Sequence, residues 1–246
     1  SVAGVFALWQ QYFKQLYPTK GQMRAATVKA LMAISADEAG AYQDAGSSTV
    51  LYSGDGPDHR FGWGLINAKR GAEILRDSKP STAVGETVVT EGLLNNGTVY
   101  EIKVKTDGTM PLKAAIAWTD PAGSVVGGTD DDTPVLVNDL DLRIIRPGGQ
   151  EVKPWALNKQ WANLYVLQSD NDVDPIEVVE YKGGVSGVAS AGEYTIRVSH
   201  KGTLINGSQK FSLIVYGLKK GGVSVKKQQF DNLAVYPNPV SDVLNI

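Results

Sequence analysis

The sequence of 246 residues has 24 Lys and Arg against 26 Asp and Glu, for a net charge of −2. With 42% hydrophobic and 20% charged residues, it has the composition of a globular protein of about two domains. The cationic residues are scattered singly, which argues against nucleic acid as a partner, and no apolar run reaches the ~18 residues of a membrane span. The absence of cysteine excludes a disulfide framework and a thiol nucleophile.

The first segment has the apolar spacing of a buried helix. Apolar side chains recur three and four residues apart at Val2, Val5, Phe6, Trp9, Phe13 and Leu16. Because Ala3, Gly4 and Ala7 fill much of the remaining early surface, this helix is predicted to be apolar nearly all round and therefore buried.

Two more helices are predicted from their start signals. Thr19 and Gln22 have the spacing of a capping box in front of a helix over about 21–36. Asn67 is expected to cap a short helix over about 68–75. The intervening stretch is rich in Gly, Ser, Asp and Pro and is predicted to be a long surface loop.

From about residue 82 the pattern changes to short alternating runs separated by turns. The clearest runs are residues 98–108, 112–120, 140–149, 176–181, 192–200 and 209–217. Their regular spacing predicts an antiparallel β-sandwich of about eight strands. The Asn-Gly pairs at 96–97 and 206–207 are interpreted as hairpin turns, with N-glycosylation in a eukaryote as the alternative.

Several motifs resemble one family in chain order. "SVAGVFAL" resembles the second half of the serine motif of subtilisin-like peptidases, and "TVKALMAISADEAG" resembles their next helix. "FGWGLINAKRGAEIL" resembles the segment that closes their catalytic domain, with Phe61 in place of the usual Tyr. "LKAAIAWTDPAG", "LVNDLDLRIIRPGG", "AGEYTIRVSHKGT" and "QKFSLIVYG" resemble the C-terminal sandwich of a subgroup. "LAVYPNPVSDVLNI" resembles the start of a type IX secretion sorting domain.

The resemblance implies an α+β fragment of three parts. Residues 1–78 would be the helical C-terminal remnant of a subtilisin-like α/β catalytic domain, and residues 82–218 an antiparallel, jelly-roll-like β-sandwich. Residues 219–246 would be a linker and a truncated sorting domain. In that family the central helix lies under a parallel sheet, so we expect its apolar side chains to be exposed in this chain as one patch, namely those of Val2, Val5, Phe6 and Trp9.

The implied function is the C-terminal portion of a secreted subtilisin-like serine endopeptidase. Its Asp, His and Ser triad would precede Ser1, so the resemblance implies no catalytic and no cofactor-binding residue within the chain. Protein or peptide substrates would bind through the missing catalytic half, and secretion machinery would bind the C-terminal tail. The protein is expected to be secreted or at the cell surface. The alternative is a secreted, non-catalytic β-sandwich adhesion or binding protein.

The two histidines and the first serine are expected to have no catalytic role. His59 is interpreted as a polar loop residue, and His200 as a surface residue at a strand end rather than a metal ligand. Nothing in the sequence activates Ser1 as a nucleophile. Trp155, Trp161 and Tyr165 either stack on a sugar or peptide or fold a loop over a sheet edge.

Acidic residues cluster along the predicted strands. Asp139 and Asp141 are two residues apart and so share one face of a strand, and oxygen-rich sites of this kind suit calcium. In the resembled sandwiches the equivalent residues surround calcium, which carries over to Asp120, Asn138, Asp139, Asp141, Asp174 and Glu177. Pro175 stands where the family often has Asn. The alternative is that these residues form Asx turns and solvated loops, which is also the interpretation of residues 130–132.

Overall fold

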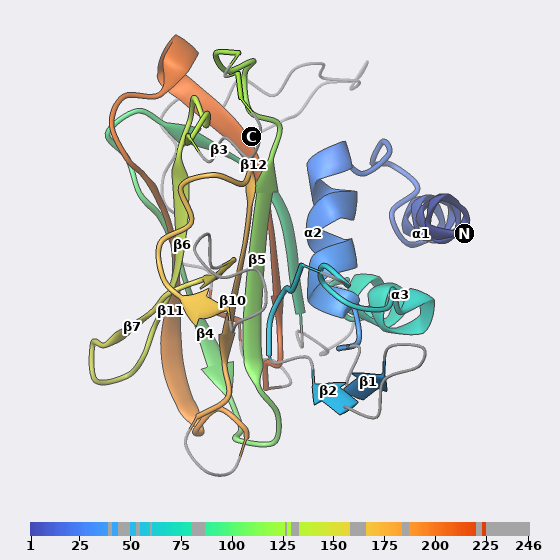
Figure 1. The fold of residues 1–246 in the computed structure, drawn as a ribbon. Helices are drawn as coiled ribbons and strands as arrows, with labels where there is room; N and C mark the ends of the chain where they lie inside the picture. Colours follow the sequence, from blue (N-terminus) through green and yellow to red (C-terminus); the bar gives the residue numbers. More distant parts are fainter. Residues whose placement is uncertain are drawn as a thin grey trace, which may run out of the picture.

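The computed structural model describes a layer of helices packed against two sheets (Figure 1). The described residues are 1–38, 41–43, 50–52, 55–59, 61–79, 87–125, 127–128, 133–157, 166–183, 187–219 and 223–224. The helices are α1 (Val2–Leu16), α2 (Ala25–Ser35) and α3 (Ala68–Asp77), with a short 3-10 turn, η1 (Ile205–Gly207). The expected combination of helices with antiparallel sheets is therefore confirmed.

Two antiparallel sheets lie face to face as a sandwich. One has the strand order β10-β5-β12-β3 and the other β13-β4-β11-β6-β7. Their bounds are β3 (Thr87–Asn95), β4 (Tyr100–Thr106), β5 (Leu112–Trp118), β6 (Leu140–Ile145), β7 (Glu151–Val152), β10 (Ile176–Tyr181), β11 (Gly192–His200), β12 (Ser208–Tyr216) and β13 (Val223–Ser224). Two short pairs lie outside the sandwich: β1 (Ala41–Gln43) with β2 (Val50–Tyr52), and β8 (Trp155–Ala156) with β9 (Leu167–Gln168).

Alternating side chains of the strands fill the space between the two sheets. Trp118, Tyr194 and Phe211 are the largest of them and are fully buried. All six expected runs form strands, and both Asn-Gly pairs lie in turns between strands. The hairpin interpretation was wrong, because β3 and β4, like β11 and β12, belong to different sheets and do not pair with each other. The sequence reasoning missed β3, which pairs with β12 along its whole length.

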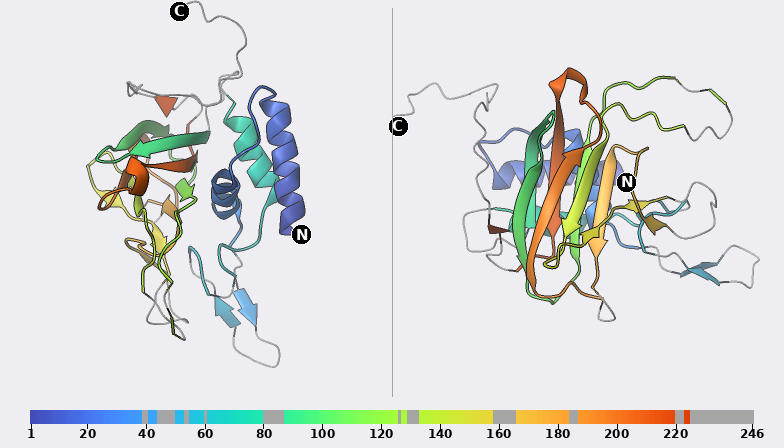
Figure 2. Two further views of the ribbon diagram at one scale, coloured as in Figure 1. Left: turned by 90° about the horizontal axis from the view of Figure 1, so that it is seen from above. Right: turned by 90° about the vertical axis from the view of Figure 1, so that its left-hand side faces the viewer.

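The helical layer covers the outer face of the four-stranded sheet. In Figure 2, α1 lies farthest from that sheet, on the outer side of the other two helices. Helix α2 packs on β5 and β12, and α3 contacts β3, where Thr87 donates to the Ile74 carbonyl at 2.8 Å. The sheet contributes Ala115, Ala117, Ile176, Val178 and Ile214 to this second core. Alanines on both α2 and β5 let the helix approach the sheet closely, and β5 is consequently buried on both faces. The segments predicted as separate domains therefore share one central sheet.

The first helix is covered on one side only. Trp9 is 1% exposed, packs against Gly71 of α3 and donates from its indole nitrogen to the Ala68 carbonyl at 2.9 Å. The expectation that Trp9 would be exposed was therefore wrong, because α3 covers it. Val2 and Leu8 are 46% and 61% exposed, so the start of α1 does present apolar surface to solvent.

The sequence predicted the start of α3 correctly and the start of α2 incorrectly. The Asn67 side chain accepts a hydrogen bond from the Arg70 backbone N–H at 2.8 Å, as expected of its N-cap role. The capping box was wrong, because α2 begins at Ala25. Glu91 of β3 takes its place, accepting from the backbone N–H of Arg24 at 2.8 Å and from the Thr27 hydroxyl.

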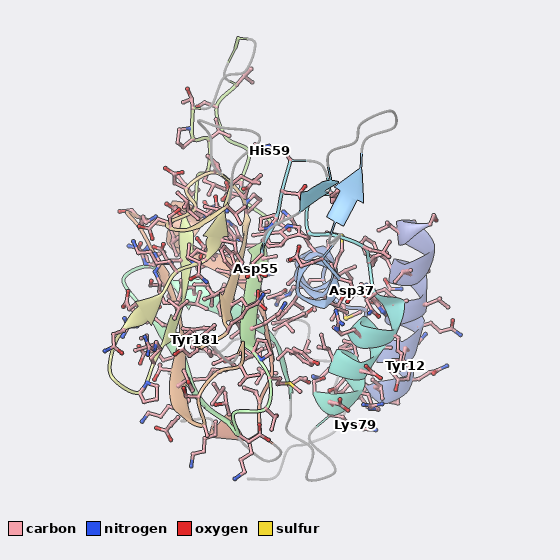
Figure 3. The ribbon with its side chains drawn as sticks, turned by 60° about the horizontal axis from the view of Figure 1, so that its bottom comes forward. Tyr12, Asp37, Asp55, His59, Lys79 and Tyr181 are labelled. Atoms are coloured by element: carbon pink, nitrogen blue, oxygen red, sulfur yellow. The ribbon has the colours of Figure 1, made fainter. Side chains whose placement is uncertain are left out.

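The segments that flank the helices are held by specific contacts. Asp37 lies between α2 and α3 (Figure 3) and pairs with Arg70, whose guanidinium also donates to the last carbonyls of α2. Strand β13 pairs with β4 inside the stretch 219–246 that was predicted to be a linker and a truncated sorting domain. Residues 225–246, which contain the predicted sorting segment, lie outside the described residues. Across the described helices, none combines the length and the apolar character needed to span a bilayer.

Candidate functional site at the seam between the sheets

The most chemically unusual group lies where strands β10 and β6 face each other across the sandwich. Glu177 of β10 is fully buried and accepts a hydrogen bond from the Leu142 backbone N–H of β6 at 2.5 Å. Because β10 and β6 belong to different sheets, this carboxyl group links the two sheets of the sandwich through a backbone amide.

Arg143 lies among several carboxylates at the same seam. It is 8% exposed, and its guanidinium donates to Asp141 at 2.9 Å and to Asp170, while lying 3.8 Å from Glu177. Lys201 adds a second cation, 3.2 Å from Asp139 and 3.4 Å from Asp141. Lys153 pairs with the second oxygen of Asp170 at 3.1 Å. We call this group the seam cluster: Asp139, Asp141, Arg143, Lys153, Asp170, Glu177 and Lys201.

Burial controls the protonation of this cluster. Loss of solvent raises the pKa of Glu177 to about 8, with the Leu142 N–H opposing the shift and the Asp141 charge adding to it. Burial also raises the pKa of Asp139, against the lowering effect of Lys201. At neutral pH Glu177 is therefore mainly protonated, while Arg143 and Lys201 offset the charges of the neighbouring aspartates.

The six residues carried over from the resemblance separate into three places. Asp139, Asp141 and Glu177 meet in the seam cluster. Asp120 instead accepts the backbone N–H groups of Val137 and Asn138 at 2.7 and 2.9 Å.

The remaining two carried-over residues also bond locally. The Asn138 side chain is buried, donating to Gln209 at 2.7 Å and accepting from the Ile205 N–H at 2.8 Å. Asp174 lies in a turn where Asn171 contacts both its side chain and its backbone N–H. Local bonds of this kind are what the alternative interpretation, Asx turns and solvated loops, predicts for these residues.

Two oxygens of the seam cluster suit a cation. Asp139 Oδ1 and Glu177 Oε1 are buried and have no hydrogen-bond partner among the described residues. A buried polar atom without a partner is costly, and a cation could bind both oxygens once Glu177 has lost its proton. As they stand, however, no three carboxylate or imidazole side chains of the described residues converge closely enough to hold a metal ion. A calcium ion would therefore need the side chains to rearrange around it.

Sequence reasoning missed the cations of this cluster. Asp139, Asp141 and Arg143 occupy alternate positions, so the period of a strand already places the arginine on the face of the two aspartates. Lys201 and Asp170 come from distant segments, and only the pairing of β6 with β11 brings Lys201 close. The period of the strand could therefore have predicted that Arg143 joins the two aspartates, whereas no local pattern predicts that Lys201 does.

The other residues considered from the sequence lie apart from the seam. His59 is exposed at the rim of the loop region, far from Tyr12 and Tyr181 in Figure 3. Trp155 packs its ring over Gly56, as expected if it covers a loop. Ser1 is exposed and its side chain makes no capping bond to α1. Trp161, Tyr165 and residues 130–132 lie outside the described residues.

Comparison with known proteins found little. No family model and no curated protein matches the sequence. One similar solved structure is Aeromonas hydrophila PliG, a periplasmic lysozyme inhibitor of g-type lysozyme, at 14% identity and a TM-score of 0.25, covering 56% of this chain and 87% of that one. Another is a protein from Sulfurospirillum deleyianum at 11% identity and a TM-score of 0.26, covering 55% and 98%. Such low TM-scores carry no inference about this chain.

Proposed function

We propose that this chain is the C-terminal portion of a secreted subtilisin-like serine endopeptidase. The three motifs around residues 1–8, 27–40 and 61–75 follow the order of that family, and strands with the resembled sandwich motifs come after them. On this proposal the helices α1, α2 and α3 are the remnant of the catalytic domain, the sandwich is of the jelly-roll type, and the Ser, His and Asp that hydrolyse the peptide bond precede Ser1.

The observation that carries the proposal is the exposed apolar start of α1. Its first turns expose Val2, Ala3, Gly4, Ala7 and Leu8, and contain no charged residue. Apolar surface left in water costs about 25 cal/mol per Å², so a helix of this kind normally has a cover. In subtilisin-like peptidases a parallel sheet covers the central helix, which supports the assignment of α1 to that position.

A serine-directed fluorophosphonate probe tests the proposal. The complete gene product, purified from the medium of its source cells, should take the label on one serine that precedes residue 1 and should cleave casein. Residues 1–246 produced alone should take no label and cleave nothing, because they lack the triad. A complete product that takes no label and cleaves nothing would refute the peptidase and favour the adhesion or binding alternative. Label on Ser1 would refute the alignment.

We also propose that calcium binds at the seam, held by Asp139, Asp141 and Glu177. The two unpartnered buried oxygens support this proposal, since the ion would contact both of them and take the place of the Glu177 proton. A ligand that binds only the folded state raises the melting temperature, so calcium should raise it relative to a chelator. Asp139→Asn should remove the shift, whereas Asp58→Asn, in the loop before α3, should leave it intact. Equal melting curves in calcium and chelator would show that calcium does not bind.

A further inference from the structure

The turn between β3 and β4, which belong to different sheets, holds a chemically reactive dipeptide. Asn96 and Gly97 form its tip and are exposed, and the Thr98 N–H closes the turn on the Asn95 carbonyl at 3.1 Å. In an Asn-Gly pair the glycine nitrogen can attack the asparagine side-chain amide, since glycine has no side chain to obstruct the five-membered ring that forms. Asparagine is for this reason one of the thermolabile residues of proteins.

A histidine from another strand holds the attacking nitrogen. The Gly97 backbone N–H donates to Nε2 of His200, the last residue of β11, at 2.8 Å. A backbone amide can only donate, so Nε2 carries no proton and the proton of the neutral ring is on Nδ1, 3.5 Å from the Lys201 carbonyl oxygen. The ring nitrogen is thus aligned to take the proton of the nucleophile.

A backbone amide polarises the group that would be attacked. The side-chain carbonyl oxygen of Asn96 accepts the Leu204 N–H at 3.0 Å. A donor in this position stabilises the negative charge that develops on the oxygen when the carbonyl carbon is attacked. The Asn96 N–H also donates to the Gly207 carbonyl at 2.8 Å, which fixes the residue against the neighbouring turn.

We propose that Asn96–Gly97 is a self-catalysed modification site, at which the folded chain converts Asn96 to aspartate and isoaspartate with His200 as the base. The Gly97 nitrogen forms a bond to Cγ of Asn96 as its proton passes to His200 Nε2. The intermediate expels ammonia, which takes that proton from the imidazolium, and leaves a succinimide. Water then opens the ring at either carbonyl. No oxidation occurs, and the net change is gain of water and loss of ammonia.

The chain contains its own matched control in Asn206–Gly207. The Gly207 N–H donates to the Leu204 carbonyl at 3.1 Å, so no imidazole touches this nucleophile. A carbonyl oxygen is too weak a base to take the proton. The two sites share a dipeptide and a turn between strands. They differ in the group that receives the glycine N–H and in the backbone of the asparagine, which is left-handed at Asn206 with a φ of 60°.

The modification would permanently change the turn between β3 and β4. Aspartate at position 96 adds a negative charge to an exposed turn, and isoaspartate lengthens the backbone by one methylene beside the Gly207 contact. Older molecules would therefore differ from new ones at one defined place in the sandwich.

Mass spectrometry of the aged, folded chain tests this proposal. The protein is kept at neutral pH, sampled over weeks and digested, and isoaspartate is labelled with an isoaspartyl methyltransferase. A positioned general base accelerates a reaction by about 100-fold or more, so Asn96 should convert that much faster than Asn206. His200→Gln keeps an acceptor for the Gly97 N–H but removes the base, and should slow conversion of Asn96 towards the rate of Asn206.

Unfolding the wild-type chain in urea is a second test that needs no variant. Both asparagines should then convert at similar rates, because neither retains its partners. The proposal is overturned if Asn96 and Asn206 convert equally in the folded chain, or if His200→Gln leaves the Asn96 rate unchanged while the protein stays folded.

Discussion

Replacing Glu177 by glutamine should change how the stability of this protein depends on pH. The folded state holds the Glu177 proton with a pKa of about 8, whereas the ordinary value is 4.5. The folded state therefore binds this proton more tightly than the unfolded state does. The resulting stability is fully present below pH 4.5 and is lost as pH rises to 8.

The size of the effect follows from the shift. At about 1.4 kcal/mol for each pH unit, the loss between these limits is about 3 to 5 kcal/mol, and no solvent discount applies because the side chain is fully buried. Glutamine keeps an acceptor for the Leu142 N–H but has no proton to lose. Glu177→Gln should therefore match the wild type near pH 4.5 and exceed it increasingly up to pH 8.

Urea denaturation followed by tryptophan fluorescence measures this difference. The measurements should be made with a chelator present, so that no calcium contributes. Glu101→Gln is the control, because it removes a half-exposed partner of Arg197 and should cost less than about 1 kcal/mol. Parallel pH profiles for wild type and Glu177→Gln would refute the reasoning, since they would mean that Glu177 titrates alike in the folded and unfolded states.

Three further predictions concern packing and charge. Gly71→Ala should lower the free energy of unfolding by about 1 to 3 kcal/mol, because the added carbon would lie 2.2 Å from the Trp9 ring. Gly4→Ala, at an open position of the same helical layer, should raise the free energy of unfolding by up to about 1 kcal/mol. Equal effects of the two changes in denaturant would contradict a tight contact. Arg143→Met should cost about 3 to 5 kcal/mol by stranding buried carboxylates, against less than about 1 kcal/mol for Arg197→Met on the exposed part of the sheet. Calorimetry should show a single unfolding transition, because helices and sandwich share a sheet; two separate transitions would show that the layers unfold independently.

Local signals in the sequence predicted most elements of the fold. Helix periodicity, the Asn67 cap and the positions of the Asn-Gly turns each depend on residues near one another in the chain, and each is confirmed. The predicted hairpins do not form, because the strands that flank each turn pair with distant segments instead. Strand β3 was missed because its run lacks clean alternation and is interrupted by Gly92. That glycine is needed because a side chain there would meet the Phe211 ring at 2.6 Å, a contact between positions far apart in the sequence.

Long-range contacts account for the other differences. The start of α2 depends on Glu91, which is 67 residues from Arg24, and no pattern near the helix could reveal it. The packing of the helices on the sandwich had a signal, since residues 114–118 form a continuous apolar run that favours burial on both faces of a strand. The burial of Trp9 depends on α3, and nothing in the sequence around Gly71 predicts that this glycine packs against Trp9.

The seam cluster shows why an acidic pattern alone does not define a metal site. Three carboxylates there face three cations, Asp139, Asp141 and Asp170 against Arg143, Lys153 and Lys201. Glu177 is the fourth carboxyl group, and burial raises its pKa further than Arg143, 3.8 Å away and shared with the aspartates, can lower it. Among the described residues, Asp139 Oδ1 and Glu177 Oε1 are buried oxygens without a hydrogen-bond partner, and a calcium ion at Glu177 has to displace its proton. At Asp139 Oδ2, Asp141 Oδ1 and Asp170 the ion has to compete with Arg143, Lys153 or Lys201, so its affinity depends on cations that the acidic motif does not contain.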